Sequence, residues 1–509
     1  MRRKISPVIA VILLALLFIT SQALAKEVKL DVKKHVLPNG LTVLIIEKHD
    51  APLVALYRYH KVGGVNEYSG MFGASHLLEH MMFKGTKKIG TWNYEAEKPI
   101  MAKIDKLVDE IDRERAKGIS DYHKMDKAKV KKLWDEVHKL QKEQRKYIRK
   151  NELDFLYEGH GARGLNASTG YDATDYYCNL PSNKLELWMF IESDRMKEPV
   201  FREFYPERDV VYEERRMRTD NNPNGLLFEN FFSHFFVAIP YGQDVVGWAT
   251  DIESLRRDKI EKYFRKYYSP GNTIIAIVGD VNEEKTMKLI KEYFGNIPAQ
   301  PLPEPIYAKE PLQRGERRIK VKYEAAPRVV IGFHGPKPGH PDQYVLDVIS
   351  SLLSSGRTSR FYKNLVRKNI AFGVSGSNWT FGYANAFVVM GSPKNPNTTQ
   401  DLEKAIYAEL ERLKTKPVGK RELQKIHNKI DARYLKIIST NMGMAQHLAH
   451  AEAWTGSWKN FDERDKMKMV SADDIMRVAK KYFTSDNRTV TVLVKKEKKK
   501  EVKQDSEKP

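Results

Sequence analysis

The segment "GASHLLEHMMFKG", residues 73–85, carries two histidines four positions apart and a glutamate directly before the second. On a helix, His76 and His80 lie on one face, so both imidazoles can reach one metal ion. Glu79 lies three positions after His76 and is well placed to take a proton from a water that zinc activates. The segment is therefore either a metal site with its own base or a helix with one surface histidine and one core histidine.

A site with two histidines needs a third ligand, and the helical segment "PERDVVYEERRM" offers carboxylates. Glu207 and Glu214 lie two turns apart on one helical face. We expect Glu214 to be the ligand and Glu207 to support the site, with an exposed acidic face as the alternative. The only cysteine, Cys178, excludes an intramolecular disulfide and a cysteine-based zinc site. The order His-x-x-Glu-His is itself a metallopeptidase signature.

The N-terminus predicts export. A basic start, "MRRK", precedes a short apolar run and the sequence "ALA", which ends at Ala25. This order is typical of a signal peptide over residues 1–25, so the mature chain would start near Lys26 and be periplasmic or secreted. An uncleaved anchor is the alternative. No later segment has the apolar length of a transmembrane helix, so we expect no stable membrane insertion.

The positive charge does not indicate a nucleic-acid partner. The formal net charge is +21, and residues 103–150 contain 16 Lys and Arg against 10 Asp and Glu, a surplus of 6. The two signs are interspersed and aromatic residues are sparse there, which is typical of a solvated helical surface. We therefore expect no nucleic-acid binding.

The length of 509 residues predicts more than one domain. Strand and helix patterns occur in the same coarse order in both halves of the chain, which predicts an α+β protein of two related α/β sandwich domains, each with an antiparallel-rich sheet covered by helices. The second half lacks His-x-x-Glu-His at the matching helix, so only the first half is a candidate for catalysis. The expected units are a domain over 26–298 with a charged helical hairpin inserted at about 95–150, a linker over 299–315, a domain over 316–494 and a charged disordered tail over 495–509.

Several motifs in a fixed order resemble one family. "PNGLTVLIIE", "HLLEHMMFKGT", "GLNASTGYDATDYY", "DRM", "YYSPGNTIIAIVGDV" and "GRTSRFYKNL" are similar to stretches of the pitrilysin/insulinase zinc metallopeptidases. The similarity covers about residues 30–494 and is strongest to the bacterial half-length branch that is similar to mitochondrial processing peptidase. It implies that the chain forms half of a clam-shell peptidase.

The resemblance also implies residue roles. His76, His80 and Glu214 match the zinc ligands, Glu79 the catalytic base, and Glu207 a carboxylate that supports the site. Asn166 matches an asparagine beside an edge strand that receives the substrate as an added strand. A plain turn asparagine is the alternative at Asn166.

Two departures from the family pattern stand out. The charged insertion lengthens the spacing between His80 and Glu214, and it would restrict access to the chamber, bind a partner, or simply be solvated. Phe372 stands where many members carry a tyrosine that reaches the substrate. This leaves open whether the far half supplies a second substrate clamp.

The resemblance predicts a zinc endopeptidase with one Zn²⁺ per chain that cleaves short or unfolded peptides, enclosed with a second copy or a sister chain as homodimer or heterodimer. The alternatives are a non-catalytic or partner-dependent subunit and a processing peptidase with one dedicated substrate. The sequence does not predict the cleavage preference.

Overall fold

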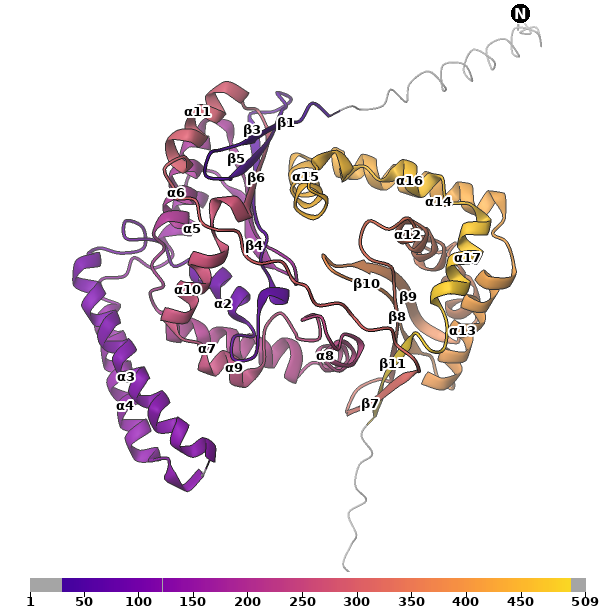
Figure 1. The fold of residues 1–509 in the computed structure, drawn as a ribbon, viewed down its shortest axis with the longest axis horizontal. Helices are drawn as coiled ribbons and strands as arrows, with labels where there is room; N and C mark the ends of the chain where they lie inside the picture. The colour runs from indigo at the N-terminus through magenta and orange to yellow at the C-terminus, as the bar shows by residue number, and fades with distance from the viewer. Residues whose placement is uncertain (1–29, 121, 496–509) are drawn as a thin grey trace, which may run out of the picture.

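The computed structural model of the chain describes residues 30–120 and 122–495 (Figure 1). The predicted signal peptide and the tail beyond residue 495 lie outside the described residues. Within these ranges, no helix has the length and apolar character needed to cross a membrane.

The first half of the chain forms a six-stranded sheet in the order β1-β2-β6-β3-β5-β4. Neighbouring strands are antiparallel except for the parallel pair β2 and β6. β4 pairs only with β5, so β4 is an edge strand. The strands are β1 (Lys33–Val36), β2 (Thr42–Glu47), β3 (Leu53–His60), β4 (Arg163–Thr169), β5 (Thr174–Pro181) and β6 (Thr273–Gly279).

Both faces of this sheet are covered, which explains the unbroken apolar run of β2. Val43 and Ile45 pack in a core with helices of the first half. The alternate residues Leu44 and Ile46 pack against a helix of the second half. A strand buried on both faces has no polar alternation. The helices of the first half are α2 (Ala74–Met82), α3 (Tyr94–Ser120), α4 (Lys127–Gln144), α5 (Glu152–Glu158), α6 (Leu185–Lys197), α7 (Phe204–Arg215), α8 (Pro223–Phe235), α9 (Ala249–Ser254), α10 (Arg257–Tyr267) and α11 (Glu283–Phe294).

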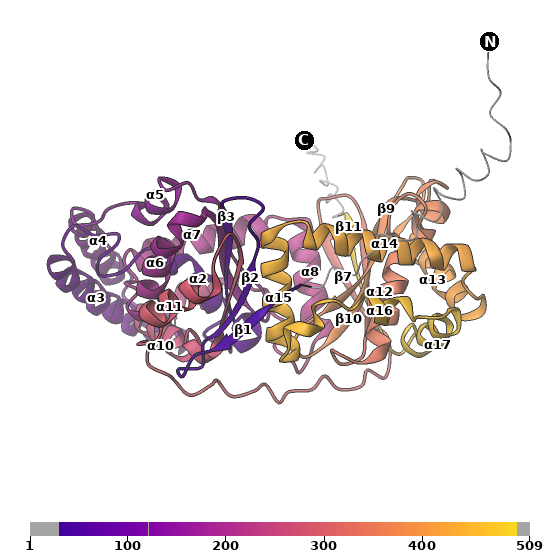
Figure 2. The ribbon, with the colours of Figure 1, turned by 90° about the horizontal axis from the view of Figure 1, so that it is seen from above.

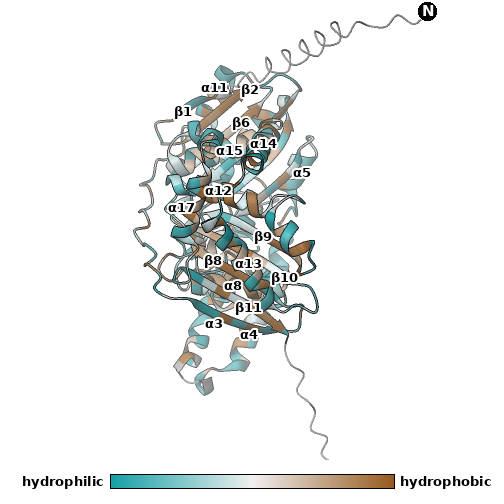
Figure 3. Cartoon of the chain, turned by 90° about the vertical axis from the view of Figure 1, so that its right-hand side faces the viewer, coloured by the Kyte–Doolittle hydropathy of each residue, from teal (hydrophilic) through white to brown (hydrophobic). Residues whose placement is uncertain are grey.

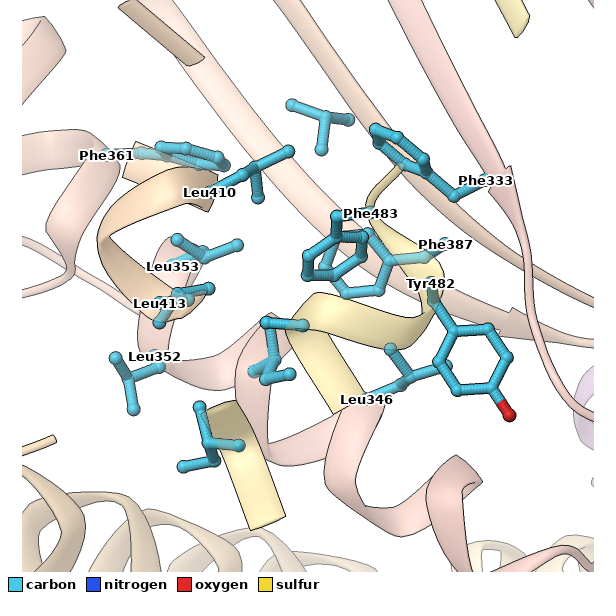
Figure 4. Packing of buried hydrophobic residues seen from close by; sticks show 14 of the residues in the cluster. Phe333, Leu346, Leu352, Leu353, Phe361, Phe387, Leu410, Leu413, Tyr482 and Phe483 are labelled. Atoms are coloured by element: carbon cyan, nitrogen blue, oxygen red, sulfur yellow. The ribbon is translucent and has the colours of Figure 1, made fainter. Parts of the chain in front are cut away.

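The second half forms a five-stranded sheet in the order β7-β11-β8-β10-β9. Its helices α12, α13 and α17 pack on one face in a large apolar core (Figure 4). The strands are β7 (Arg317–Tyr323), β8 (Arg328–His334), β9 (Ala371–Thr380), β10 (Asn385–Pro393) and β11 (Arg488–Lys495). The helices are α12 (Pro341–Ser354), α13 (Thr399–Thr415), α14 (Lys420–Ile438), α15 (Asn441–Thr455), α16 (Arg464–Lys468) and α17 (Ala472–Tyr482).

The two sheets are copies of one arrangement. The order β2-β6-β3-β5-β4 matches β7-β11-β8-β10-β9 strand for strand, with the single parallel pair at the same place in each. Helix α2 follows β3 as α12 follows β8, and each is followed by a glycine with positive φ, Gly85 at 87° and Gly356 at 74°. The predicted α+β class with two related sandwiches is confirmed.

Counting back from Gly85 and Gly356 allows the metal motif of α2 to be compared with the residues of α12. His76, Glu79 and His80 lie nine, six and five residues before Gly85. The same offsets before Gly356 give Asp347, Ser350 and Ser351. None of these three is a histidine, so the second helix lacks both imidazoles that a zinc site of this type needs.

The two halves exchange equivalent helices. Helix α15 of the second half packs on the first sheet, where Leu448 is fully buried (Figure 1). Helix α8 of the first half packs on the second sheet, where a Cβ at Gly332 would lie 2.3 Å from the ring of Phe231. Helix α15 covers an apolar face of the first sheet and helix α8 covers an apolar face of the second. Two apolar cores, each built from both halves, therefore fix the relative position of the halves.

The predicted charged hairpin is confirmed as α3 and α4, which pack against each other and project from the body (Figure 1). Its colour in Figure 3 is mainly hydrophilic, whereas β2 and β6 are mainly hydrophobic. The hairpin buries a narrow apolar seam that includes Val108, Ile111 and Val137. A seam of this kind is enough to hold two antiparallel helices together.

Residues 298–314 contain no helix or strand and run along one side of the molecule between the sheets (Figure 2). Glu310 anchors this segment, because its carboxylate accepts a hydrogen bond from the backbone N–H of Val237 at 2.8 Å. We propose the domain limits 26–298 and 316–494 with residues 299–315 as the linker, the limits that the sequence predicts.

The helix exchange predicts that the two halves unfold together. Leu448→Ala removes a fully buried side chain from the first sheet and should lower the free energy of unfolding by about 2–5 kcal/mol. Leu435→Ala is the matched control, because Leu435 is 55% exposed on the neighbouring helix α14 and its loss should cost less than about 0.5 kcal/mol. Urea denaturation followed by tryptophan fluorescence measures both. Equal effects of the two substitutions would contradict the packing role of α15.

Candidate metal centre

Helix α2 presents His76, Glu79 and His80, and its N-terminus is fixed by a buried carboxylate. Gly73 precedes the helix with φ at 91°, and a Cβ there would lie 2.5 Å from the carbonyl oxygen of Val246. Gly73 has no side chain to cap the helix. Glu67 replaces the cap, accepting hydrogen bonds from the backbone N–H of Gly73 at 2.8 Å and of Ser75 at 2.6 Å. Burial raises the pKa of Glu67 to about 8, so this carboxyl holds the helix end through hydrogen bonds rather than through its charge.

The C-terminal end of α2 is fixed by a buried arginine. Arg195 of α6 is 1% exposed and donates from Nε to the carbonyl oxygen of Met82 at 3.0 Å. Its charge is balanced by Glu192, whose carboxylate lies 2.5 Å from Nη1. A cation at this end is the favourable sign for the helix dipole. The two ends of α2 are thus held by hydrogen bonds with two buried side chains, Glu67 and Arg195.

The structure brings His76, His80 and Glu214 together, with one possible ligand atom from each within 4.8 Å of the others. The Nε2 atoms of His76 and His80 lie 3.7 and 3.5 Å from the two carboxylate oxygens of Glu214 on α7. Ligands about 2.0–2.1 Å from a tetrahedral zinc ion are about 3.3 Å apart. The donor types and their spacing therefore fit zinc.

Glu207 lies two turns before Glu214 on the same face of α7 and orients His80. The Nδ1 atom of His80 lies 2.9 Å from Oε1 of Glu207, and the Lys84 ammonium lies 2.6 Å from Oε2. A histidine that donates from Nδ1 to a carboxylate keeps its Nε2 lone pair for a metal. His76 lacks such support among the described residues, because its buried Nδ1 has no hydrogen-bond partner.

The two histidines have opposite protonation tendencies in the metal-free protein. Burial lowers the pKa of His76 to about 4, so this ring is neutral at pH 7. Burial also lowers the pKa of His80, but hydrogen bonds with Glu207 and Glu214 outweigh it and raise the pKa to about 9. The hydrogen bond with His80 lowers the pKa of Glu214, so this carboxylate is ionised.

Glu79 points to the edge strand rather than into the trio of ligands. Its carboxylate accepts a hydrogen bond from the hydroxyl of Thr169, the last residue of β4. Burial raises the pKa of Glu79, which favours proton transfer near neutral pH. Cys178 is buried in the core of the first sheet, away from these groups.

Asn166 lies on β4, the edge strand that also carries Thr169. Its side chain is exposed and its Oδ1 accepts a hydrogen bond from the backbone N–H of Ala167 at 2.9 Å. The structure does not place Asn166 among the possible metal ligands. The edge of β4 that faces away from β5 is free to accept a further strand.

A cavity of about 310 Å³ lies beside the site and includes Glu79, His80 and Glu207 in its wall. Residues 148–154, which follow the hairpin α3–α4, form the opposite wall. Their position is fixed by a hydrogen bond from the backbone N–H of Arg149 to the carbonyl oxygen of Gly90 at 3.1 Å. The chain that leaves the hairpin is therefore part of the surroundings of the site. Phe372, by contrast, is 69% exposed on β9.

Sequence reasoning missed several supporting residues. Lys84 lies four positions after the predicted ligand His80, and Arg218 lies four positions after the predicted ligand Glu214. This helical spacing could have indicated that both side chains lie near the site. Thr169 lies within the motif "GLNASTGYDATDYY", but the motif alone does not indicate its contact with Glu79. Glu67 lies six residues before Gly73, in the loop that leads into α2, and Arg195 lies on the distant helix α6. The three-dimensional packing reveals that these two side chains hold the ends of α2.

Comparisons with known proteins agree with this geometry. Residues 42–98 match the family model "Insulinase (Peptidase family M16)", and residues 254–430 match "Peptidase M16 inactive domain". The zinc protease PqqE of Helicobacter pylori is 30% identical over 472 residues, which is 90% of this chain and 91% of that protein. The chain belongs to peptidase family M16.

Solved structures support the same assignment. The crystal structure of a protease from Helicobacter pylori has a TM-score of 0.76 and 26% identity, covering 92% of this chain and all of that one. The periplasmic protease PqqL from Escherichia coli shares the fold with a TM-score of 0.67 and 16% identity, and this chain spans 48% of its length. The predicted half-length type is confirmed. The name "inactive domain" fits the absence of both histidines from α12.

The pKa of His80 predicts how zinc binding depends on pH. Below pH 9 the metal-free His80 is protonated and must release this proton before it can bind zinc, whereas His76 is already neutral. Zinc affinity should therefore increase about tenfold per pH unit between roughly pH 6.5 and 8.5. Chelator competition at several pH values measures this slope.

Glu207→Gln is the matched variant for this test. It removes a charge that raises the pKa of His80, so its slope should be shallower at the upper end of the range. A pH-independent zinc affinity in the wild-type protein would contradict the assignment of His80.

Proposed function

We propose that this chain is an exported zinc-dependent endopeptidase that cleaves short or unfolded peptides. The observation that carries the proposal is the convergence of His76, His80 and Glu214 beside Glu79, with α2 held at both ends by hydrogen bonds with buried side chains. The names of the relatives support it, because PqqE is called a zinc protease and PqqL a periplasmic protease.

The residues around the metal site have separate roles in the proposed peptide hydrolysis. The chemistry that zinc supplies when bound is polarisation of the scissile carbonyl and acidification of a water. Glu79 accepts a proton from the attacking water and passes it to the leaving amine, while Thr169 holds its carboxylate. Glu207 keeps His80 in the tautomer that leaves Nε2 free.

The edge of β4 is the proposed substrate site. A peptide that adds to this edge as an antiparallel strand hydrogen-bonds through its backbone, so many side chains are tolerated. Because Thr169 on β4 contacts Glu79, a strand added there passes the general base. Asn166 lies on the same strand and is the proposed contact to the substrate backbone. Extended peptides fit this mode and folded proteins do not.

A second chain is proposed as the other half of the enzyme. This chain spans about half of PqqL, whose second half has no counterpart here. A second copy or a sister chain would close over the β4 edge and supply the contacts that the exposed Phe372 does not. A non-catalytic role in such a pair is the competing function, and a dedicated processing peptidase is another.

Glu79→Gln tests the catalytic proposal directly. The amide cannot accept the proton of the water, so peptide turnover should fall by about 10²–10⁴-fold while zinc content stays at one per chain. A fluorogenic peptide library, assayed with and without chelator, measures turnover, and metal analysis measures zinc. Glu213→Gln is the control, because Glu213 is 58% exposed on the same helix as Glu214 and pairs with Arg216.

Three results separate the candidate functions. Loss of activity in Glu79→Gln but not in Glu213→Gln, with broad cleavage by the wild type, supports the general peptidase. Cleavage of few or no library members, with one partner protein cut at a single place, supports the dedicated processing enzyme. Wild-type turnover by Glu79→Gln would contradict the assignment of Glu79 as the general base.

A further inference from the structure

Among the described residues, Arg218 is the one arginine or lysine that forms an ion pair with the distal ligand Glu214. It lies four positions after Glu214, and its Nη1 is 2.8 Å from Oε1 of that carboxylate. The side chain is 70% exposed, so its charge faces solvent at the open side of the site. An acid placed four residues before a base on a helix is the favourable order for an ion pair.

The backbone that carries Arg218 is unusually well fixed for so exposed a side chain. Residues Arg216–Asp220 form a π-turn directly after α7, a feature often found at functional sites. A Cβ at Gly225 would lie 2.1 Å from the carbonyl oxygen of Arg218, so only glycine allows α8 to pack against this turn. On the other side, the buried Thr219 donates to Asp244 at 2.9 Å. These contacts therefore fix the position of the Arg218 backbone.

The contacts around the Glu214 carboxylate show what Arg218 does there. Oε1 lies 3.7 Å from Nε2 of His76 and Oε2 lies 3.5 Å from Nε2 of His80. If both Nε2 atoms bind a metal, neither can donate a hydrogen bond to the carboxylate. Arg218 is then the only one of these three groups that still orients Glu214. Ligating carboxylates generally need such a hydrogen bond to keep their geometry.

We propose that Arg218 is a positioning residue for the zinc site, which holds the Glu214 carboxylate in the orientation that binds the metal. This inference rests on the zinc site of the proposed function. Because the guanidinium is largely solvated, screening weakens its repulsion of the metal, and the orienting effect dominates.

The chain offers a matched control in the same turn. Arg216 carries the same charge two residues earlier, is 50% exposed, and pairs with Glu213 through Nη1 at 2.9 Å. Glu213 is not among the possible ligands. Arg218→Ala and Arg216→Ala therefore remove the same side chain from the same turn, one at the metal ligand and one beside it.

The test is zinc titration of the metal-free full-length chain against a chromophoric chelator. Arg218→Ala should weaken zinc binding by about 10–100-fold, and Arg216→Ala should change it by less than about twofold. Arg218→Lys keeps the charge but lacks the planar fork, so it should recover only part of the loss. Thermal unfolding of the metal-free variants should be the same for Arg218→Ala and Arg216→Ala, because neither side chain is buried.

Peptide turnover provides the second readout. With zinc in large excess, Arg218→Ala should regain wild-type turnover and KM, because a positioning residue of the ligand does not touch the substrate. Zinc affinity within twofold of wild type, or tighter, overturns the proposal, as does a turnover defect that saturating zinc leaves in place. A wild-type chain that binds zinc but cleaves no peptide refutes the proposed function alone, because the titration still decides the role of Arg218. A wild-type chain that binds no zinc contradicts both.

Discussion

The site depends on how helix α2 is held. Its N-terminus is bonded by the carboxylate of Glu67 and its C-terminal carbonyl by the guanidinium of Arg195. Both side chains are buried, so their geometry cannot relax into solvent. Burial raises the pKa of Glu67 to about 8, so this carboxyl holds the N-terminus through hydrogen bonds, whereas Arg195 adds a charge of the sign that the C-terminal end of the helix dipole favours. Three functional side chains on a helix of nine residues gain their fixed positions from these contacts.

The duplicated fold explains why one chain carries one site. The two sheets have the same strand order, and α2 and α12 occupy equivalent places. Helix α12 contains no histidine, so the second copy lacks both imidazoles of the metal motif of the first. The second copy instead contributes α15, which covers the first sheet, so it supports the site through packing. Because α8 and α15 each pack on the sheet of the other half, we expect the two halves to unfold together.

Much of this arrangement could be predicted from the sequence because it is local. Helical spacing relates His76 to His80, and Glu207 to Glu214, and the apolar runs of β2 and β6 indicate buried strands. The resemblance to a family then related the two distant helices. The contact of Arg195 with the C-terminal end of α2, the role of Thr169 and the place of residues 148–154 beside the site arise from contacts between distant segments, which no local pattern encodes. The π-turn after α7 was also beyond prediction, because the sequence there reads as a regular helix.

The central claim is that His76, His80 and Glu214 hold one zinc ion, and zinc-edge X-ray absorption of the purified full-length chain tests it most directly. The account predicts one zinc per chain, with two imidazole nitrogens and oxygen ligands at about 2.0–2.2 Å and no sulfur. His80→Ala should leave at most one imidazole in the spectrum of any zinc that remains. A spectrum without two imidazoles in the wild type, or a wild-type chain without stoichiometric zinc, would contradict the account.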